Sequence, residues 1–276
     1  MALESLAELI RFGPDAYGVR YENHVAAFFT GLDGVILVDP CGQHNPRVPF
    51  VIKEAIRSLT EQPVKYVVYS HWGADHGMGG AAFADTAQFV GHRNTVGKIK
   101  AAKDPHSPPP TVIVDKQMTL ELGSNKLDLH FADFSEQDDY LVVHHPASRL
   151  IMTIDYVQPK NVPFRMLLGN PDKIIERLQW IHDKLDFDVL VSGHTAPQVT
   201  GTKQDVLEAR QYLLDLSTAV DRARSAGKAD ASAEMKAAVE AELKPKYGSW
   251  RRFDTMLAEN VEGLIGWRAG KNLRFN

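Results

Sequence analysis

The chain has 276 residues, of which 44% are hydrophobic and 24% are charged, and its formal net charge is -4. A chain of this length can bury one large core. The lack of a basic excess argues against a nucleic-acid-binding surface and favours a neutral or anionic small-molecule substrate. The single cysteine, Cys41, excludes an internal disulfide bond and a zinc site built from cysteines.

The amino-terminal segment, residues 1–12, predicts a short amphipathic helix that ends near Gly13 and Pro14. Glu4 and Glu8 interrupt its apolar positions, so it lacks the uninterrupted apolar core of a secretory signal. No apolar run in the chain approaches the length of a membrane span. We therefore expect a cytoplasmic protein with no membrane partner.

A hairpin, a helix and a buried strand are predicted next. In residues 17–39, two apolar runs surround a turn that contains glycine at both ends, which is typical of a β-hairpin. A polar loop and a helix over about residues 51–59 lead to the apolar, β-branched run of residues 64–69. That run predicts a central strand.

The central strand ends at a cluster of ionisable side chains. His71, Asp75 and His76 follow it directly, and the glycines of residues 77–80 allow a tight turn after them. In open α/β sheets, ligands bind at the carboxyl ends of strands. The spacing therefore places two imidazoles and a carboxylate where such a sheet carries its chemistry.

A second sheet and a helical segment are predicted downstream. The proline-rich segment 104–110 cannot form regular structure, whereas alternating apolar residues predict strands across residues 111–154. Residues 171–185 have helical spacing, and residues 187–194 predict a final buried strand. From residue 203 onward the chain is predicted to be mainly helical.

Four segments, in the same order as in the family, resemble motifs of the metallo-β-lactamase superfamily. The family signature is His-x-His-x-Asp-His; here it reads His71, Gly73, Asp75 and His76, so the second histidine is missing. The other segments are GHRNT at residues 91–95, IMTIDYV at 151–157 and VSGHTAP at 191–197.

This resemblance extends over roughly the first three quarters of the chain. It implies an α/β fold, the four-layer αββα sandwich of the metallo-β-lactamases. Residues 1–276 are accordingly predicted to form a single domain, with residues 203–276 as a helical carboxyl-terminal extension.

The family binds up to two metal ions, and the resemblance implies that one of the two sites is intact here. In the family, the second ion is held by the Asp-His pair, a later histidine and an aspartate that bridges both ions. The corresponding residues are Asp75, His76, Asp155 and His194. Two imidazoles and two carboxylates are sufficient to hold one divalent ion.

The first site of the family is incomplete in this chain. His71 retains one ligand, Gly73 occupies the position of the next, and Ser135 or Glu136 occupies the position of the third, depending on a one-residue gap. We therefore predict one ion, zinc by preference, with iron or manganese also compatible with the mixed ligand set. Alignment of Glu136 with the third position would help to recruit a second ion. His71 either ligates the metal, hydrogen-bonds its water or orients Asp75.

The function implied is that of a metal-dependent hydrolase. A single metal-bound hydroxide would attack a small electrophile, such as an activated ester, lactone, thioester or activated carbon-halogen bond. Asp75 and His71 are the candidate bases. The alternative is a catalytically inactive protein of the same fold that binds a small molecule or regulates a partner; an iron-dependent redox or lyase activity is a further possibility. A homodimer is possible.

Four other histidines lie outside the predicted ligand set. His24 and His44 lie in a region that would overhang the site in this fold; His44 could contact substrate there, and a solvated loop is its simpler interpretation. His144 and His145 alternate across a predicted strand, so at most one of them can face a pocket.

Overall fold

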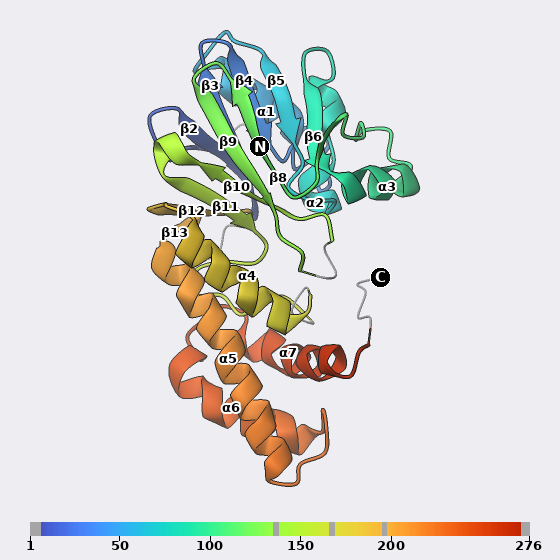
Figure 1. Ribbon diagram of the computed structural model, residues 1–276, viewed down its shortest axis with the longest axis vertical. Helices are drawn as coiled ribbons and strands as arrows, with labels where there is room; N and C mark the ends of the chain where they lie inside the picture. The colour runs from blue at the N-terminus through green and yellow to red at the C-terminus, as the bar shows by residue number, and fades with distance from the viewer. Residues whose placement is uncertain (1–6, 135–137, 166–168, 195–197, 272–276) are drawn as a thin grey trace. The chain divides into compact units, whose positions relative to one another are not determined.

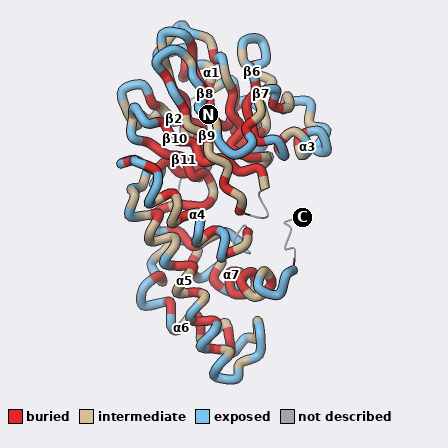
Figure 2. The backbone as a smooth tube through the Cα atoms, in the orientation of Figure 1, coloured by how far each residue is buried: buried red, intermediate tan, exposed pale blue. Residues whose placement is uncertain are grey.

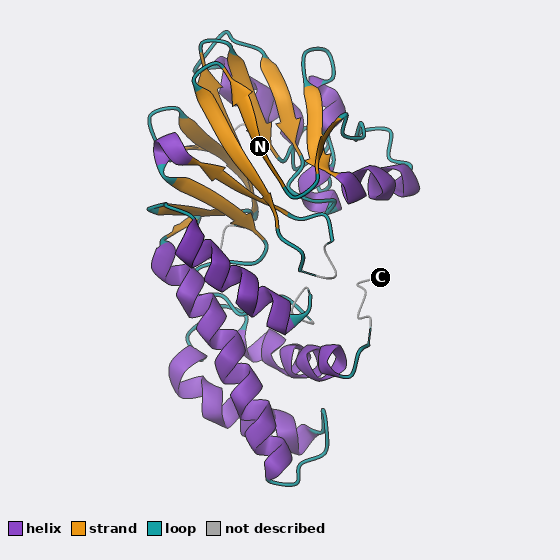
Figure 3. Ribbon diagram, in the orientation of Figure 1, coloured by secondary structure: helices purple, strands orange, loops and turns teal. Residues whose placement is uncertain are grey.

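The computed structural model separates into two compact units, each held together mainly by its own contacts. Unit 1 contains the sheets, and unit 2 is mostly helical (Figures 1 and 3). Unit 1 comprises Met1–Ala132, Asp138–Asp155 and Asp186–Thr195, and unit 2 comprises Asp133–Gln137, Tyr156–Leu185 and Ala196–Asn276. The structure describes residues 7–134, 138–165, 169–194 and 198–271.

The first sheet of unit 1 has seven strands that follow one another in chain order. Strands β1 to β4 are antiparallel neighbours, and β4 to β7 are parallel neighbours. The parallel half brings the carboxyl ends of β5 and β6 to the same edge of the sheet. The strands are β1 (Ala7–Arg11), β2 (Ala16–Tyr21), β3 (His24–Gly31), β4 (Gly34–Val38), β5 (Val64–Val68), β6 (Gln88–His92) and β7 (Val112–Val114).

The second sheet of unit 1 has the strand order β12-β11-β10-β9-β8. All neighbours are antiparallel except β11 and β12, which are parallel and therefore end at the same edge. Strands β10 and β11 are buried along their whole length (Figure 2). The strands are β8 (Gln117–Leu122), β9 (Asn125–Phe131), β10 (Leu141–His145), β11 (Leu150–Ile154) and β12 (Val189–Ser192).

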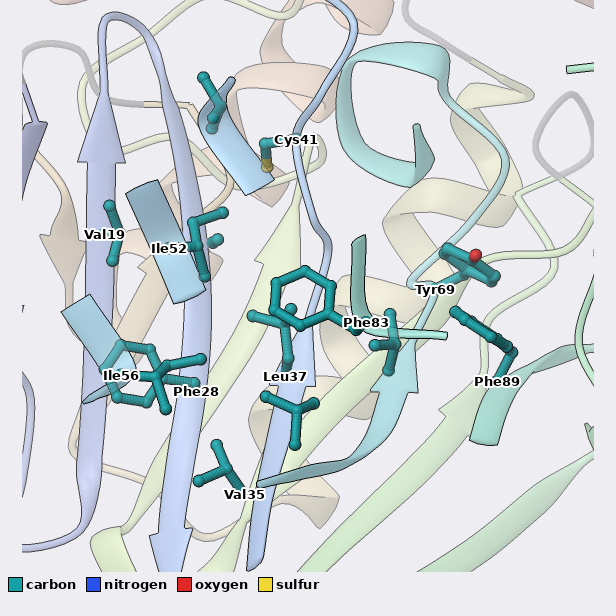
Figure 4. Packing of buried hydrophobic residues seen from close by; sticks show 14 of the residues in the cluster. Val19, Phe28, Val35, Leu37, Cys41, Ile52, Ile56, Tyr69, Phe83 and Phe89 are labelled. Carbon is teal, nitrogen blue, oxygen red and sulfur yellow. The ribbon is translucent and has the colours of Figure 1, made fainter. Parts of the chain in front are cut away.

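Helices of unit 1 pack on the first sheet through one continuous apolar core. Ile52 and Ile56 of the first helix lie against Phe28 and Leu37 of the strands, and all four side chains are buried (Figure 4). Their spacing of four residues places both isoleucines on one helix face. The helical segments are α1 (Val48–Arg57), α2 (Ala74–Gly77), η2 (Gly80–Phe83), α3 (Arg93–Ala102) and η3 (Pro146–Ser148).

Unit 2 confirms the predicted helical segment from residue 203 onward and the helix near residues 171–185. The Tyr212 hydroxyl donates a 2.8 Å hydrogen bond to Asn260 Oδ1 in the interior of this unit. Among the described residues, no helix is both long and apolar enough to cross a membrane. The elements are α4 (Pro171–Lys184), β13 (Thr200–Gly201), α5 (Lys203–Ser225), α6 (Ala233–Tyr247) and α7 (Phe253–Arg268).

Two expectations about secondary structure were wrong. The helix predicted for residues 1–12 is strand β1 over Ala7–Arg11, and the preceding six residues lie outside the described part of the chain. An isolated helix of this length is marginal in water, whereas β1 gains a complete ladder of hydrogen bonds with β2. Strand β7, expected in the second sheet, pairs with β6 in the first. Its apolar pattern is compatible with either sheet, so only the chain path decides.

Candidate metal centre

The five predicted site residues come together in unit 1, although they are far apart in the sequence. His71 follows β5, Asp75 and His76 lie in α2, Asp155 follows β11, and His194 follows β12. Strand β5 belongs to the first sheet and β11 and β12 to the second. The site is therefore built from the ends of strands in two sheets.

Four potential ligand atoms converge around one point. His76 Nε2 lies 3.1 Å from His194 Nε2, 3.2 Å from Asp155 Oδ1 and 3.5 Å from Asp75 Oδ2. His194 Nε2 lies 2.9 Å from Asp155 Oδ1 and 3.6 Å from Asp75 Oδ2. His76 is fully buried, whereas the Asp75 side chain is 30% exposed, so the group opens to solvent on the Asp75 side.

This donor set fits a divalent cation. Two imidazole nitrogens and two carboxylate oxygens face the same point, and both types of atom are ligands of zinc, iron and manganese. The other ring nitrogen of His76, Nδ1, is buried without a hydrogen-bond partner among the described residues and lies 3.9 Å from Asp39 Oδ2. A ligating histidine commonly directs its other ring nitrogen toward a carboxylate.

The electrostatics of the group favour positive charge at its centre. Burial alone would raise the pKa of Asp155, but the facing imidazoles, that of His76 above all, hold it well below its usual range. Burial alone would lower the pKa of His76, but Asp155 and Asp75 raise it well above its usual value. The carboxylates are therefore ionised at neutral pH, and the negative field that favours a proton on His76 also favours a bound cation.

His71 contacts the carboxylate of Asp155 and is separated from the opening of the site. Its Nε2 lies 3.2 Å from Asp155 Oδ2, its Nδ1 lies 3.0 Å from Ser70 Oγ, and its ring stacks on Tyr140. Only 2% of the side chain is exposed. These contacts suit a residue that orients Asp155. The roles predicted for His71 as a ligand and as a base stay predictions.

The position of the missing histidine faces the same region. A Cβ on Gly73 would lie 2.6 Å from His71 Nε2 and 2.9 Å from Asp75 Oδ1. The imidazole of His71 thus fills the space into which a side chain at position 73 would extend. Ser135 and Glu136, the candidates for the third ligand of the first site, lie outside the described residues.

No protein-family model matches the sequence, and a search of curated proteins finds no match. Solved structures do match. A stereoselective inverting sec-alkylsulfatase from Pseudomonas sp. superimposes with a TM-score of 0.73 at 15% identity, over 96% of this chain and 50% of that chain. A metallo-β-lactamase from Pontibacter korlensis superimposes with a TM-score of 0.59 at 19% identity, over 75% of this chain and 99% of that chain.

The chain has the metallo-β-lactamase fold. The predicted fold class is therefore confirmed, with two mixed sheets flanked by helices and the helical extension α5 to α7. The extension lies within the match to the alkylsulfatase, of which this chain spans about half the length. A B3 metallo-β-lactamase with an active-site glutamic acid also matches, with a TM-score of 0.58 at 17% identity over 80% of this chain and 96% of that chain.

Within this metallo-β-lactamase fold, His24 is a site residue that the sequence did not identify. Its Nε2 lies 3.4 Å from Asp75 Oδ2, and its ring centre lies 4.7 Å from that of His194. His24, Asp75, His76 and His194 each offer a ligand atom, and these atoms all lie within 4.8 Å of one another. An isolated antiparallel β-bridge between His24 and His194 brings His24 to the centre. No sequence motif around His24 predicts this pairing.

The backbone around Asp155 and His194 has an unusual conformation. Ile154 has a φ of 37°, a rare value for a β-branched residue, and it lies in an irregularity of the ladder between β11 and β12. Gly193 permits the close approach at this point, because a Cβ there would lie 2.4 Å from Ile154 Cγ2 and 2.9 Å from His76 Cε1. The strained turn and the glycine together direct the side chains of Asp155 and His194 to the centre.

A buried carboxylate anchors the loop that carries the motif. Asp139 accepts hydrogen bonds from the Trp72 backbone N–H at 2.8 Å, the Thr95 hydroxyl at 2.8 Å and the Lys98 ammonium at 2.7 Å. Burial alone would raise the pKa of Asp139, but Lys98 and the other donors hold it below its usual value. The residues after β5 are thereby fastened to α3.

Proposed function

We propose that this protein is a metal-dependent hydrolase in which Asp75, His76, Asp155 and His194 hold one divalent ion, zinc by preference. The observation that carries the proposal is the convergence of their four ligand atoms, with neighbouring distances of 2.9–3.6 Å. A purely structural hydrogen-bond network has no need to place two imidazole Nε2 atoms 3.1 Å apart beside two ionised carboxylates.

An ion bound there supplies a Lewis acid and lowers the pKa of a water molecule toward about 7. The chain contributes the proton acceptor. Asp75 is the most exposed of the four residues, with 30% of its side chain accessible, so its carboxylate can receive a proton at the opening of the site. His24 Nε2, 3.4 Å from Asp75 Oδ2, is positioned to accept that proton in turn.

We favour one ion over two because the first site of the family has no ligand at Gly73. His71 Nε2 lies 3.2 Å from Asp155 Oδ2, so it supports the bridging carboxylate instead of completing a second ion's ligand set. With a single Lewis acid, a developing oxyanion receives less stabilisation. The reaction should therefore be restricted to substrates with good leaving groups: activated esters, lactones, thioesters or activated carbon-halogen bonds.

Alkyl sulfate esters are a second candidate class of substrate. The observation that favours them is the match to the sec-alkylsulfatase, which covers 96% of this chain and so includes the helical extension, whereas the match to the metallo-β-lactamase from Pontibacter korlensis covers 75%. Sulfate is a good leaving group, which is consistent with a site that has one Lewis acid.

Metal content per chain, measured on protein purified without added metal, tests the proposal. We expect the wild type to hold one ion and Asp75→Ala and His194→Ala to lose it, together with hydrolysis of p-nitrophenyl acetate or an alkyl sulfate. His106→Ala is the matched control, because it removes an exposed histidine outside the centre. An equal metal content in all four proteins would contradict the proposed centre. Metal loss without any hydrolysis in the wild type would favour the inactive binding protein.

A further inference from the structure

A second group of potential metal ligands lies on the second sheet of unit 1, outside the centre described above. Asp128 and His130 alternate along β9, so they share one face of the sheet. His144 of β10 is paired directly with Asp128 and therefore lies on the same face. Each of the three residues offers a ligand atom, and these atoms all lie within 4.8 Å of one another.

Two of these side chains are oriented by a further partner. The Thr119 hydroxyl donates a 2.7 Å hydrogen bond to Asp128 Oδ1, which turns Oδ2 toward β10. The Nε2–H of His144 faces the Asp186 carbonyl oxygen at 3.0 Å, and a carbonyl can only accept. In the neutral ring, the lone pair of His144 is therefore on Nδ1, which faces Asp128 Oδ2 at 3.8 Å.

Asp128 Oδ2 and His144 Nδ1 are two electron-pair donors that face each other, an arrangement that a bound cation stabilises. At 3.8 Å they are too far apart for a direct hydrogen bond from a protonated His144 to Asp128. A third donor, His130, lies on the same face of the sheet and offers a ligand atom within 4.8 Å of the other two. The combination of a ligand and an outer hydrogen-bond partner is typical of metal sites in proteins.

We propose that Asp128, His130 and His144 form a second site for a divalent cation of the zinc class, which cross-links β9 and β10. Zinc bonds of about 2.0–2.1 Å require ligand atoms closer together than 4.8 Å, so the side chains would rotate inward as the ion binds. The Asp128 side chain is 31% exposed, which gives the ion access from solvent. Three protein ligands leave a position for water, so this site should be weaker than the four-residue centre.

Titration of metal-free protein with zinc chloride, followed by calorimetry, tests this site. The wild type should bind two ions per chain. In His130→Ala, the affinity for the more weakly bound ion should fall at least about 10-fold or be lost altogether. Thr119→Val removes only the hydrogen bond that orients Asp128, and it should weaken the second ion about 10-fold while the stoichiometry stays at two. His106→Ala again controls for the loss of one histidine.

A variant without the first centre separates this proposal from the proposed function. Asp75→Ala/His194→Ala should still bind one zinc ion and should melt at a higher temperature when zinc is added, whether or not the protein is a hydrolase. Adding His130→Ala to this variant should abolish both effects. Circular dichroism without metal verifies that each variant is folded. If Asp75→Ala/His194→Ala binds no zinc, or if His130→Ala and Thr119→Val both bind zinc as the wild type does, the cluster is an ion pair and the second site does not exist.

Discussion

Replacing Gly193 with alanine tests how tightly the ends of β11 and β12 pack around the metal centre. The added Cβ would lie 2.4 Å from Ile154 Cγ2 and 2.9 Å from His76 Cε1. Ordinary contacts between carbon atoms are about 3.5–4.0 Å, so the two neighbours must move apart by roughly 1 Å. Overpacking of this kind costs about 1–3 kcal/mol, and in a protein of this size each kcal/mol lowers the Tm by about 2–4 °C.

The displacement also acts on the ligands. His76 is a proposed ligand, and Ile154 directly precedes Asp155, so Gly193→Ala is expected to weaken zinc binding at the centre about 10–100-fold. A competition titration with a chromophoric chelator measures this affinity, and a thermal melt measures the stability.

Gly97→Ala is the control substitution. Gly97 lies inside α3, and a Cβ there would have no atom within 4 Å, so this variant should be stabilised by about 0.5–1 kcal/mol with unchanged zinc affinity. A Gly193→Ala protein that binds zinc as tightly as the wild type and melts at the same temperature would refute this account of the centre.

Three further predictions concern the buried charges and the metal. Differential scanning calorimetry should show a lower Tm after removal of the ion with EDTA, and stoichiometric zinc should restore the Tm. Asp139→Ala should lower the free energy of unfolding in urea by about 2–4 kcal/mol, because buried donors lose their acceptor. In the control Asp138→Ala, the lost carboxylate is 50% exposed, so the free energy of unfolding should change by less than about 0.5 kcal/mol. Equal effects of the two substitutions would contradict the anchoring role of Asp139. In unit 2, partial burial would raise the pKa of Asp215, but Lys246 and Tyr247 lower it. The stability that Asp215 contributes is therefore complete above its unfolded pKa of about 3.9 and is lost as the pH falls through its lower folded pKa. Asp215→Asn should reduce the Tm at pH 7, and the reduction should become smaller as the pH is lowered. A reduction in Tm that does not depend on pH would contradict this prediction.

Local sequence patterns predicted the frame of the centre. The apolar run before His71 predicts a strand by its length and its β-branched residues. The glycines after His76 predict a tight turn. Asp155 and His194 each follow a similar run. Because β11 and β12 are parallel neighbours, Asp155 and His194 lie at the same edge of the second sheet, whereas the residues after β5 come from the first sheet.

Contacts between distant segments were not visible in such patterns. His24 begins β3 and reaches the centre only because it bridges to His194, 170 positions later in the chain. The register between β9 and β10 likewise decides that His144 is paired with Asp128, and a shift of one residue would place His145 there instead. The strand β1 exists because β2 offers it a free edge.

The amino-acid sequence by itself indicated the fold class, which the structure confirmed, and the candidate ligands Asp75, His76, Asp155 and His194, because four short motifs in the right order resemble those of the metallo-β-lactamases. Only the tertiary structure decided that His24 joins the centre, that His71 supports Asp155, and that Asp128, His130 and His144 share one face. These relations depend on strand order and register, which are set by packing between residues far apart in the chain.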